Sequence, residues 1–250
     1  MEELDLGAVV PTIKKILLIG AEGSGKTHFI GTMPKPIYIF SFDGGYRTLA
    51  GMAGITVGVC MDEDRYKPHA YADFKQKFDM FKKGLVKYKW PDGREEPYKT
   101  LAFDSFTTLS KYIFDNEQKV NNTIDKPAGY GPYMNTKSRL QDTVIQANYM
   151  SEYVVCTAQI ESEKDEITGE IFFKPSTEGK FRDEAGQWFD AVLFLVVDKN
   201  TDGTKVYKAL TVGDRRQKAK IRLPSSLASK IDAVEKPDFQ VLLTKINGGK

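Results

Sequence analysis

The chain has 250 residues, of which 41% are hydrophobic, and its formal net charge at pH 7 is only +2. This length suits one α/β domain with insertions, or one domain with a small appendage. The nearly balanced charge excludes a basic field over the whole protein, so any contact with DNA has to come from local patches. The two cysteines, Cys60 and Cys156, lie in apolar stretches and the two histidines are far apart, which leaves no pattern for a zinc site.

No apolar stretch is long enough to cross a membrane, and the acidic N-terminus is not that of a signal peptide. Cysteines of this kind suit a reducing compartment. We therefore expect a soluble protein of the cytoplasm that has no membrane partner. Residues 1–13 form an acidic and then apolar lead, which we expect to be an N-terminal packing arm.

The first predicted strand, Ile16 to Ile19, leads into the run Gly20-Ala21-Glu22-Gly23-Ser24-Gly25-Lys26-Thr27. This is the pattern G-x-x-x-x-G-K-[ST] with a strand before it and a helix after it, the helix ending before Pro34. The glycines let the backbone N–H groups turn inward and form a nest for phosphate at a helix N-terminus. A plain glycine turn is the alternative, but spacing, sequence and flanks together favour a nucleotide-binding phosphate loop.

In such a loop Lys26 would reach the β- and γ-phosphates, and the Thr27 hydroxyl would ligate Mg²⁺. The expected cofactors are therefore ATP and Mg²⁺. The residues expected to contact the nucleotide are Gly20, Ala21, Glu22, Gly23, Ser24, Gly25, Lys26, Thr27 and His28.

The remaining elements follow from hydrophobic period and turn residues. Strands are predicted over Ile37–Phe42, Ile55–Cys60, Thr100–Asp104, Tyr153–Ala158, Ala191–Val197, Val206–Val212 and Phe239–Ile246, with a small hairpin over Ile167–Phe173. Helices are predicted over Ala70–Tyr88, Phe106–Val120 and Thr136–Met150, with a functional or mobile loop over Asn121–Pro132. There is no internal repeat or linker, so we expect a single domain over residues 1–250, with residues 191–250 forming a C-terminal antiparallel β extension.

Strands that alternate with helices predict an α/β fold with a mainly parallel sheet, which binds ligands outside the carboxyl ends of its strands. Asp104 lies at such an end and would hold Mg²⁺, directly or through water. The alternative is an N-cap of the following helix. Ser105 follows it, where many P-loop motor proteins have a glutamate that orients the attacking water.

Two other residues lie at strand ends. Asp43 is the best candidate for the missing base, since its carboxylate could polarise a water beside the γ-phosphate; a plain turn at Asp43-Gly44-Gly45 is the alternative. Gln159 could touch the γ-phosphate and report its presence to the next loop, or it could be a surface amide.

Five positive charges occur within the eight residues Arg215 to Arg222. The run could be a solvated surface, could bind a phosphate backbone, or could stabilise a transferring phosphate on a neighbouring subunit. Lys218 and Lys220 share one face of an extended segment, which suits the last role.

Together these residues resemble the RecA family, and in particular the small phage-encoded RecA-like ATPases that anneal single-stranded DNA. The resemblance covers most of the chain. It rests on the phosphate loop, Asp43-Gly44-Gly45, Leu101-Ala102-Phe103-Asp104-Ser105, Tyr130-Gly131, Ala158-Gln159, Phe189-Asp190 and Lys218-Ala219-Lys220-Ile221-Arg222. Asp43 stands where the family leads us to expect a glutamate, and Gln159 resembles the RecA glutamine rather than the histidine expected in close relatives.

The resemblance implies the sheet order 5-1-4-3-2 and single-stranded DNA as partner, facing the loops after Asp104 and Gln159. It further implies a homo-oligomeric ring or filament in which Lys218 and Lys220 act in trans, a phage-infected bacterial cell, and a single-strand binding protein as a further partner. From the residues themselves, loop aromatics could stack on bases while nearby cations follow phosphates, or the same aromatics could close a small core. The aromatics are Tyr130, Tyr133, Phe172, Phe173 and Phe181, and the cations are Lys126, Lys137, Lys174, Lys180 and Arg182.

Two other functions compete with an ATPase that acts on DNA. A small-molecule kinase could use Asp214-Arg215-Arg216 as a lid, although this run follows a β-hairpin rather than forming a helical flap. A nucleotide-gated assembly module would bind ATP and change its subunit contacts without turnover.

Overall fold

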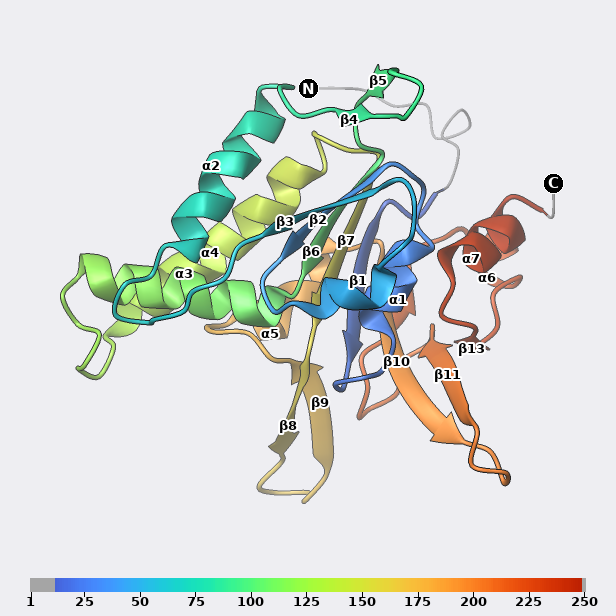
Figure 1. Ribbon diagram of the computed structural model, residues 1–250. Coiled ribbons are helices and arrows are strands. Elements are labelled where there is room, and N and C mark those ends of the chain that lie inside the picture. Colours follow the sequence, from blue (N-terminus) through green and yellow to red (C-terminus); the bar gives the residue numbers. More distant parts are fainter. Residues whose placement is uncertain (1–11, 249–250) are drawn as a thin grey trace.

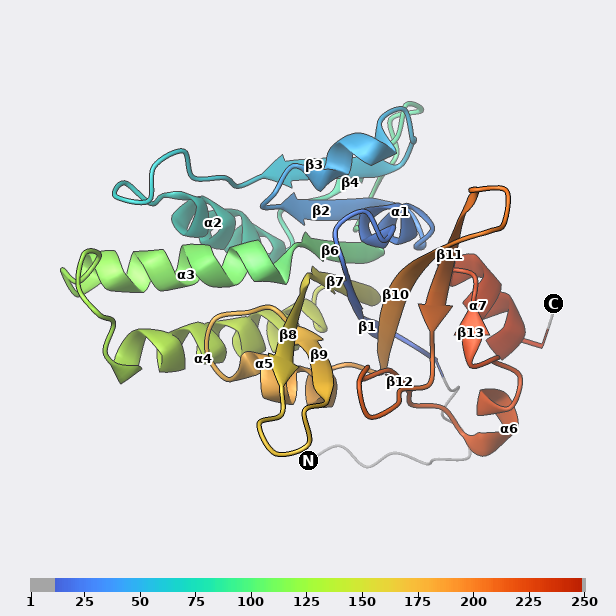
Figure 2. The same cartoon turned by 90° about the horizontal axis from the view of Figure 1, so that it is seen from below.

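The structure, a computed structural model, describes residues 12–248. A nine-stranded sheet crosses the molecule and carries helices on both faces (Figures 1 and 2). Its parallel part consists of β10 (Ala191–Lys199), β1 (Lys15–Gly20), β7 (Tyr153–Ala158), β6 (Thr100–Asp104), β2 (Ile37–Ser41) and the edge strand β3 (Ile55–Val59), in that order. Without the edge strand β3, the five inner strands have the predicted order 5-1-4-3-2. The predicted arm overlaps residues 1–11, which lie outside the described part of the chain.

Antiparallel strands extend the sheet beyond β10, as predicted. They are β11 (Lys205–Leu210), β12 (Lys220–Ile221) and β13 (Val234–Glu235). The strand from Ala191, however, pairs in parallel with β1, so it belongs to the core rather than to the extension.

Helices cover the two faces of the sheet unequally. On one face lie α2 (Ala70–Lys82), α3 (Phe106–Val120), α4 (Tyr130–Ala147), the short α5 (Phe181–Glu184) and the 3₁₀ turn η2 (Ala185–Trp188). On the other lie α1 (Lys26–Gly31), the 3₁₀ turn η1 (Gly45–Leu49), α6 (Ser225–Ala228) and α7 (Phe239–Ile246). None of the helices within residues 12–248 has both the length and the apolar character needed to cross a membrane.

The core is divided into two layers by the sheet. Alternate residues of β1 face opposite layers, with Leu17 and Ile19 packing toward α2–α4, and Ile16 and Leu18 toward α1 and α7. All residues of β2, β6 and β7 are buried, which explains their continuous apolar sequence.

The predicted strand Phe239–Ile246 is wrong, because this segment is the helix α7. Its buried residues are Phe239, Leu242 and Ile246, which have helical spacing. The Asp238 side chain caps the helix by accepting a hydrogen bond from the N–H of Gln240 at 3.0 Å. The β-rich composition of the segment concealed this period.

Two predicted helix boundaries are also wrong. Helix α2 ends at Lys82, because Gly84 adopts φ = 67°, and Leu85 is 65% exposed rather than part of the apolar face. Helix α4 begins at Tyr130, so Tyr130 and Tyr133 lie on a helix and not in a loop.

Two hairpins lie outside the main layers. One is β4 (Tyr88–Lys89) with β5 (Glu95–Glu96). The other is β8 (Ile160–Lys164) with β9 (Ile171–Pro175), which projects from the carboxyl edge of the parallel sheet (Figure 1).

Candidate nucleotide-binding site

The phosphate loop connects the end of β1 at Gly20 with the start of α1 at Lys26. Only glycine fits at Gly20, because a Cβ there would lie 2.7 Å from the carbonyl oxygen of Leu195. Gly25, the N-cap of α1, has φ = 91°, a left-handed conformation that favours glycine. The loop therefore turns sharply enough to present its N–H groups at the positive end of the helix.

Two polar side chains of the loop are available to a phosphate, one without a hydrogen-bond partner in the described part of the chain and one bonded only to backbone carbonyl oxygens of the loop itself. The Ser24 hydroxyl is buried and makes no hydrogen bond within the described residues. The Lys26 ammonium folds back and donates hydrogen bonds to the carbonyl oxygens of Gly20 and Ala21, both at 2.8 Å. Burial lowers the pKa of Lys26, while the charges of Asp104 and Asp43 oppose that shift. A bound phosphate would offer both side chains a better partner than they have here.

Asp104, the last residue of β6, is 2% exposed, and both of its carboxylate oxygens are engaged. Oδ2 accepts a hydrogen bond from the Thr27 hydroxyl at 2.7 Å, and Oδ1 accepts one from the Thr157 hydroxyl of β7. Burial raises the pKa of Asp104, against the lowering effect of these hydrogen bonds. The helix cap is Ser105 and not Asp104, since the Ser105 hydroxyl accepts the N–H of Thr108.

Gly45 marks a space where oxygens from three elements converge. A Cβ at this residue would lie 3.0 Å from Thr27 Oγ1, and 3.3 Å from both Asp104 Oδ2 and Asp43 Oδ1. Hydroxyl and carboxylate oxygens are hard ligands of the kind that Mg²⁺ accepts, with waters and phosphate oxygens completing its shell. The residues present therefore fit a magnesium ion, which Thr27 and Asp104 would hold.

Asp43 follows β2 and is exposed to solvent. Its Oδ1 accepts a hydrogen bond from the N–H of Gly45 at 3.1 Å, so it does form the turn that sequence reasoning offered as the alternative role. The same turn places the Asp43 carboxylate beside Gly45, near the Thr27 and Asp104 oxygens. Its assignment as the water-activating base stays a prediction.

Gln159 separates β7 from β8 and lies at the base of the projecting hairpin. Its N–H donates to the Thr107 hydroxyl of α3 at 2.9 Å, and its carbonyl accepts the N–H of Ser176, after β9, at 2.7 Å. The N–H of Glu178 in turn donates to the Ser110 hydroxyl of α3 at 3.0 Å. Both ends of the hairpin are thus fastened to the helix that begins after Asp104.

Lys218 and Lys220 are not brought to the phosphate loop of their own chain. They line a cavity of about 410 Å³ on the face opposite α1, whose floor includes Leu17 and Val192. Lys220 pairs with Val192, three residues before Leu195, the partner of Gly20. At about 3.3 Å per residue, Lys220 therefore lies about 10 Å before the level of Gly20 along the strand direction. Burial lowers the pKa of Lys220, as does the nearby Arg222.

The phosphate loop and the order of the strands are typical of P-loop proteins. Residues 12–223 match a family described as AAA domain. The chain belongs to this family. Its match covers every element of the site described above, from β1 to β12. A search of curated proteins gave no match.

Membership makes the AAA domain described here a P-loop NTPase, and domains of this kind typically bind a nucleotide and Mg²⁺. The mostly parallel sheet with flanking helices is the corresponding α/β fold.

Sequence reasoning missed three residues at the site of this AAA domain. Thr157 looked like an ordinary strand residue, Gly45 was treated only as part of a turn, and Tyr207 of β11 was not considered. Tyr207 lies beside the phosphate loop, since a Cβ at Gly25 would lie 3.3 Å from its Cδ1 atom. Only the position of Thr157 near the carboxyl end of a predicted strand could have indicated its role. His28 is exposed on α1, and its contact with the nucleotide stays a prediction.

Proposed function

We propose that this AAA-domain protein is a RecA-like ATPase that uses Mg²⁺·ATP and acts on single-stranded DNA, in annealing or strand pairing during phage recombination or replication. The observation that carries the proposal is the fastening of the β8–β9 hairpin to the first turns of α3, through Gln159, Thr107 and Ser110. Helix α3 begins directly after Asp104. A change at the metal-bound γ-phosphate therefore has a short covalent and hydrogen-bonded route to a projecting element.

In this proposal the phosphate loop cradles the triphosphate and Lys26 leaves its carbonyl partners for the β- and γ-phosphates. Thr27 and Asp104 hold the metal ion, and Asp43 orients the attacking water. The magnesium ion would neutralise charge on the transferring phosphate.

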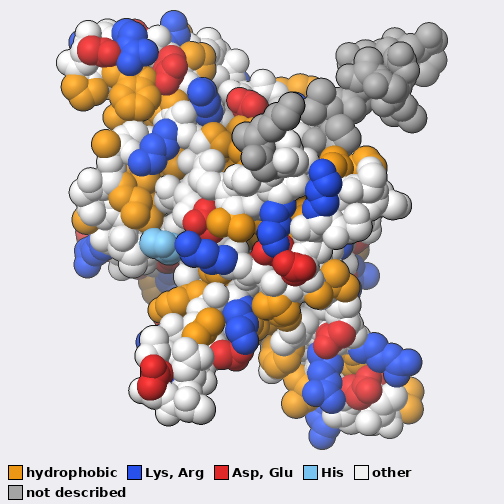
Figure 3. Space-filling model, turned by 90° about the vertical axis from the view of Figure 1, so that its right-hand side faces the viewer, with side chains coloured by type: hydrophobic (Ala, Val, Ile, Leu, Met, Phe, Trp, Pro, Cys, Tyr) orange, Lys and Arg blue, Asp and Glu red, His pale blue; other side chains and the backbone are white. Residues whose placement is uncertain are grey.

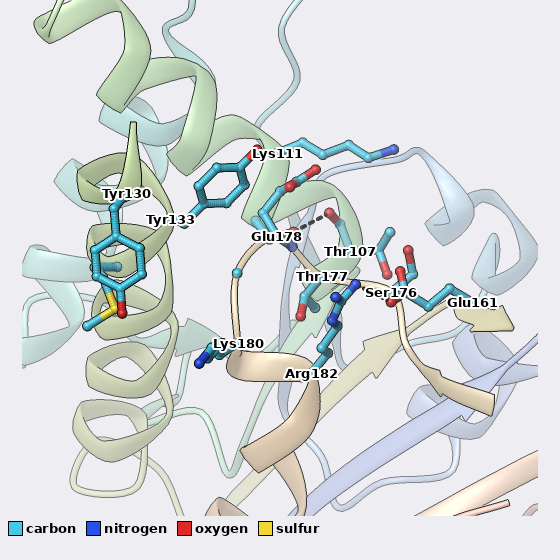
Figure 4. A pocket seen from close by; sticks show the side chains of 13 residues that line it. Thr107, Lys111, Tyr130, Tyr133, Glu161, Ser176, Thr177, Glu178, Lys180 and Arg182 are labelled. Atoms are coloured by element: carbon cyan, nitrogen blue, oxygen red, sulfur yellow. Dashed lines mark hydrogen bonds and ion pairs between the residues drawn. The ribbon is translucent and has the colours of Figure 1, made fainter. Parts of the chain in front are cut away.

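The proposed DNA contact lies in a hollow of about 310 Å³ beside the hairpin, lined by α3, α4 and residues 176–180 (Figure 4). Tyr130 and Tyr133 of α4 lie along one side and are 71% and 39% exposed. Lys111 and Lys180 supply cations at its border. Exposed tyrosine rings give the bases of single-stranded DNA a surface to stack on, and the neighbouring lysines can neutralise its phosphates.

Several residues predicted to contact DNA are engaged otherwise. Phe181 is 1% exposed in the core, and Phe173 packs on Phe194 with ring centroids 6.1 Å apart. Three of the predicted cations form ion pairs within the described residues: Lys137 with Glu184, Lys174 with Glu163 and Asp183, and Arg182 with Glu161.

The β8–β9 hairpin itself is acidic. Residues 160–175 carry five carboxylates and two lysines, so the hairpin repels a phosphate backbone rather than binding it. On the face shown in Figure 3, basic and acidic side chains are intermixed with apolar ones. The DNA contact that we propose is therefore local, at the tyrosine-lined hollow.

The test is ATP turnover measured without DNA, with single-stranded DNA and with duplex DNA. We expect single-stranded DNA to raise the rate, and Lys26→Ala to abolish nucleotide binding or turnover, whereas Lys87→Ala, on the exposed loop after α2, leaves both unchanged. Unchanged turnover in Lys26→Ala would overturn the site assignment. Transfer of phosphate to a nucleoside or sugar would indicate a kinase, and binding without turnover a nucleotide-gated assembly module.

A second arm tests the hollow. Tyr130→Ala should reduce the stimulation by single-stranded DNA about tenfold, since stacking contributes about 1–3 kcal/mol per base. The matched control is Tyr149→Ala, because Tyr149 is 86% exposed beyond the end of α4. Equal stimulation in both variants would remove the hollow from the proposal.

A further inference from the structure

The ring of Tyr207, on β11, lies beside the phosphate loop at Gly25. A Cβ at Gly25 would lie 3.3 Å from Cδ1 and 3.8 Å from Cε1 of the ring. The contact involves one edge of the ring, and the side chain as a whole is still 41% exposed. Part of the Tyr207 ring is therefore exposed to solvent beside Gly25, the N-cap of α1.

The register of the sheet explains why the ring stands there. Gly20, the last residue of β1, pairs with Leu195, and Tyr207 pairs with Val197, two residues further along β10. Leu195 and Ala209 belong to the core layer that contains α1, and Val197 and Tyr207 lie on the same face because side chains alternate along a strand. Val197, at 36% exposure, and Tyr207 therefore lie together past the end of β1, on the face of the sheet that carries α1.

The direction in which a nucleotide lies follows from the metal site. Asp104 and Asp43 come after β6 and β2, which lie on one side of β1 in the sheet, whereas β10 and β11 lie on the other side. A terminal phosphate with a metal ion at the Thr27 and Asp104 oxygens would point toward Asp104. The opposite end of the same molecule, with ribose and base, would then leave the loop on the side of β10 and β11, where Tyr207 lies.

We propose that Tyr207, with Val197 behind it, is the base-binding subsite of this AAA domain, and that the nucleobase stacks on the Tyr207 ring. The inference rests on nucleotide binding at the phosphate loop, but not on hydrolysis or on DNA. Stacking uses the π-face that every base has, so this subsite binds adenine and guanine nucleotides with similar affinity.

The experiment measures the affinities of the full chain for Mg²⁺·ATP, Mg²⁺·GTP and Mg²⁺·tripolyphosphate by calorimetry. Tripolyphosphate has no base and reports on the phosphate loop alone. We expect Tyr207→Ala to weaken ATP and GTP binding about tenfold, and to leave tripolyphosphate binding unchanged. Tyr207→Phe keeps the ring and should bind all three ligands within about twofold of the natural chain. Tyr149→Ala is the control for loss of an exposed tyrosine far from the loop.

Two results would overturn the inference. If Tyr207→Ala weakens tripolyphosphate as much as ATP, the ring only supports Gly25 and does not meet the base. If it changes neither affinity, the base lies elsewhere. If thermal unfolding shows that the alanine variant does not fold, Tyr207→Leu is compared with Tyr207→Phe instead. The inference then requires that Tyr207→Leu loses affinity for ATP but not for tripolyphosphate, and that Tyr207→Phe loses neither. Absence of turnover or of DNA stimulation would count only against the proposed function.

Discussion

Asp104 and Gly45 show how single residues shape the candidate magnesium site. A buried carboxylate is disfavoured as a charge, which is why burial raises the pKa of Asp104, yet its two threonine partners hold it in place as an acceptor. Gly45 contributes by having no side chain, because the space it leaves is bounded by three oxygens. A cation in that space would favour the charged carboxylate and compensate for its burial.

Gly45→Ala should therefore weaken binding of Mg²⁺·ATP about tenfold, since overpacking typically costs about 1–3 kcal/mol. The fold should survive, because Gly45 does not have a positive φ. Calorimetry and thermal unfolding measure the two effects separately. Gly129→Ala is the matched control, as nothing lies within 4 Å of a Cβ there. Equal affinities in both variants would contradict this view of the site.

At the scale of elements, α7 closes the core layer beside α1. Phe239 and Leu242 are buried there, and Phe239 meets the rings of Phe29 and Tyr153. The N–H of Phe239 also donates to the Thr32 hydroxyl just after α1, at 2.9 Å. The helix that carries the phosphate loop is thus supported from behind by the end of the chain.

Helical packing of this segment predicts which substitutions destabilise the protein. Leu242→Ala should lower the free energy of unfolding by about 2–5 kcal/mol, because it leaves a cavity at a residue that is 1% exposed. Val241→Ala, at a half-buried neighbouring position, should cost less than about 1 kcal/mol. Denaturant titration compares the two. A strand would bury alternate residues, so that Val241 would be buried together with Phe239. A larger loss of stability in Val241→Ala than in Leu242→Ala would therefore favour the strand.

For the whole molecule, the separation of Lys218 and Lys220 from the phosphate loop bears on assembly. Within one chain they lie on the opposite face of the sheet from α1. A catalytic role for them consequently requires a second copy, in the proposed ring or filament, that brings them to its neighbour's nucleotide.

Turnover per subunit should then rise with protein concentration. Lys218→Ala and Lys220→Ala should each reduce the maximal rate by about 100-fold, the loss typical when one group that stabilises transition-state charge is removed. ATP affinity of the dilute protein should stay unchanged. Arg215→Ala, in the same exposed run, controls for lost charge. Turnover that is independent of concentration and of both lysines would exclude the trans role.

Local patterns in the chain were sufficient for the phosphate loop and the inner strands, whereas the order of the strands followed from the resemblance to the RecA family. The strand–glycine–helix motif is complete within residues 15–31, and the burial of β2, β6 and β7 follows from continuous apolar runs. Where two local signals competed, prediction failed: β-rich composition hid the helical period of α7, and the Gly131-Pro132 pair was read as loop although it lies in the first turn of α4. Proline is tolerated in the first turn, because its missing N–H has no helical partner there.

The amino-acid sequence by itself determined which residues could hold phosphate and metal, because glycine, lysine, threonine and aspartate carry that chemistry wherever they are placed. Only the tertiary structure decided what surrounds them. Thr157 bonds to Asp104 across 53 residues, and Tyr207 lies beside Gly25 because β11 pairs with β10 and β10 with β1, which no local pattern encodes. Contacts between distant segments depend on sheet register, and register is set by the packing of the whole domain.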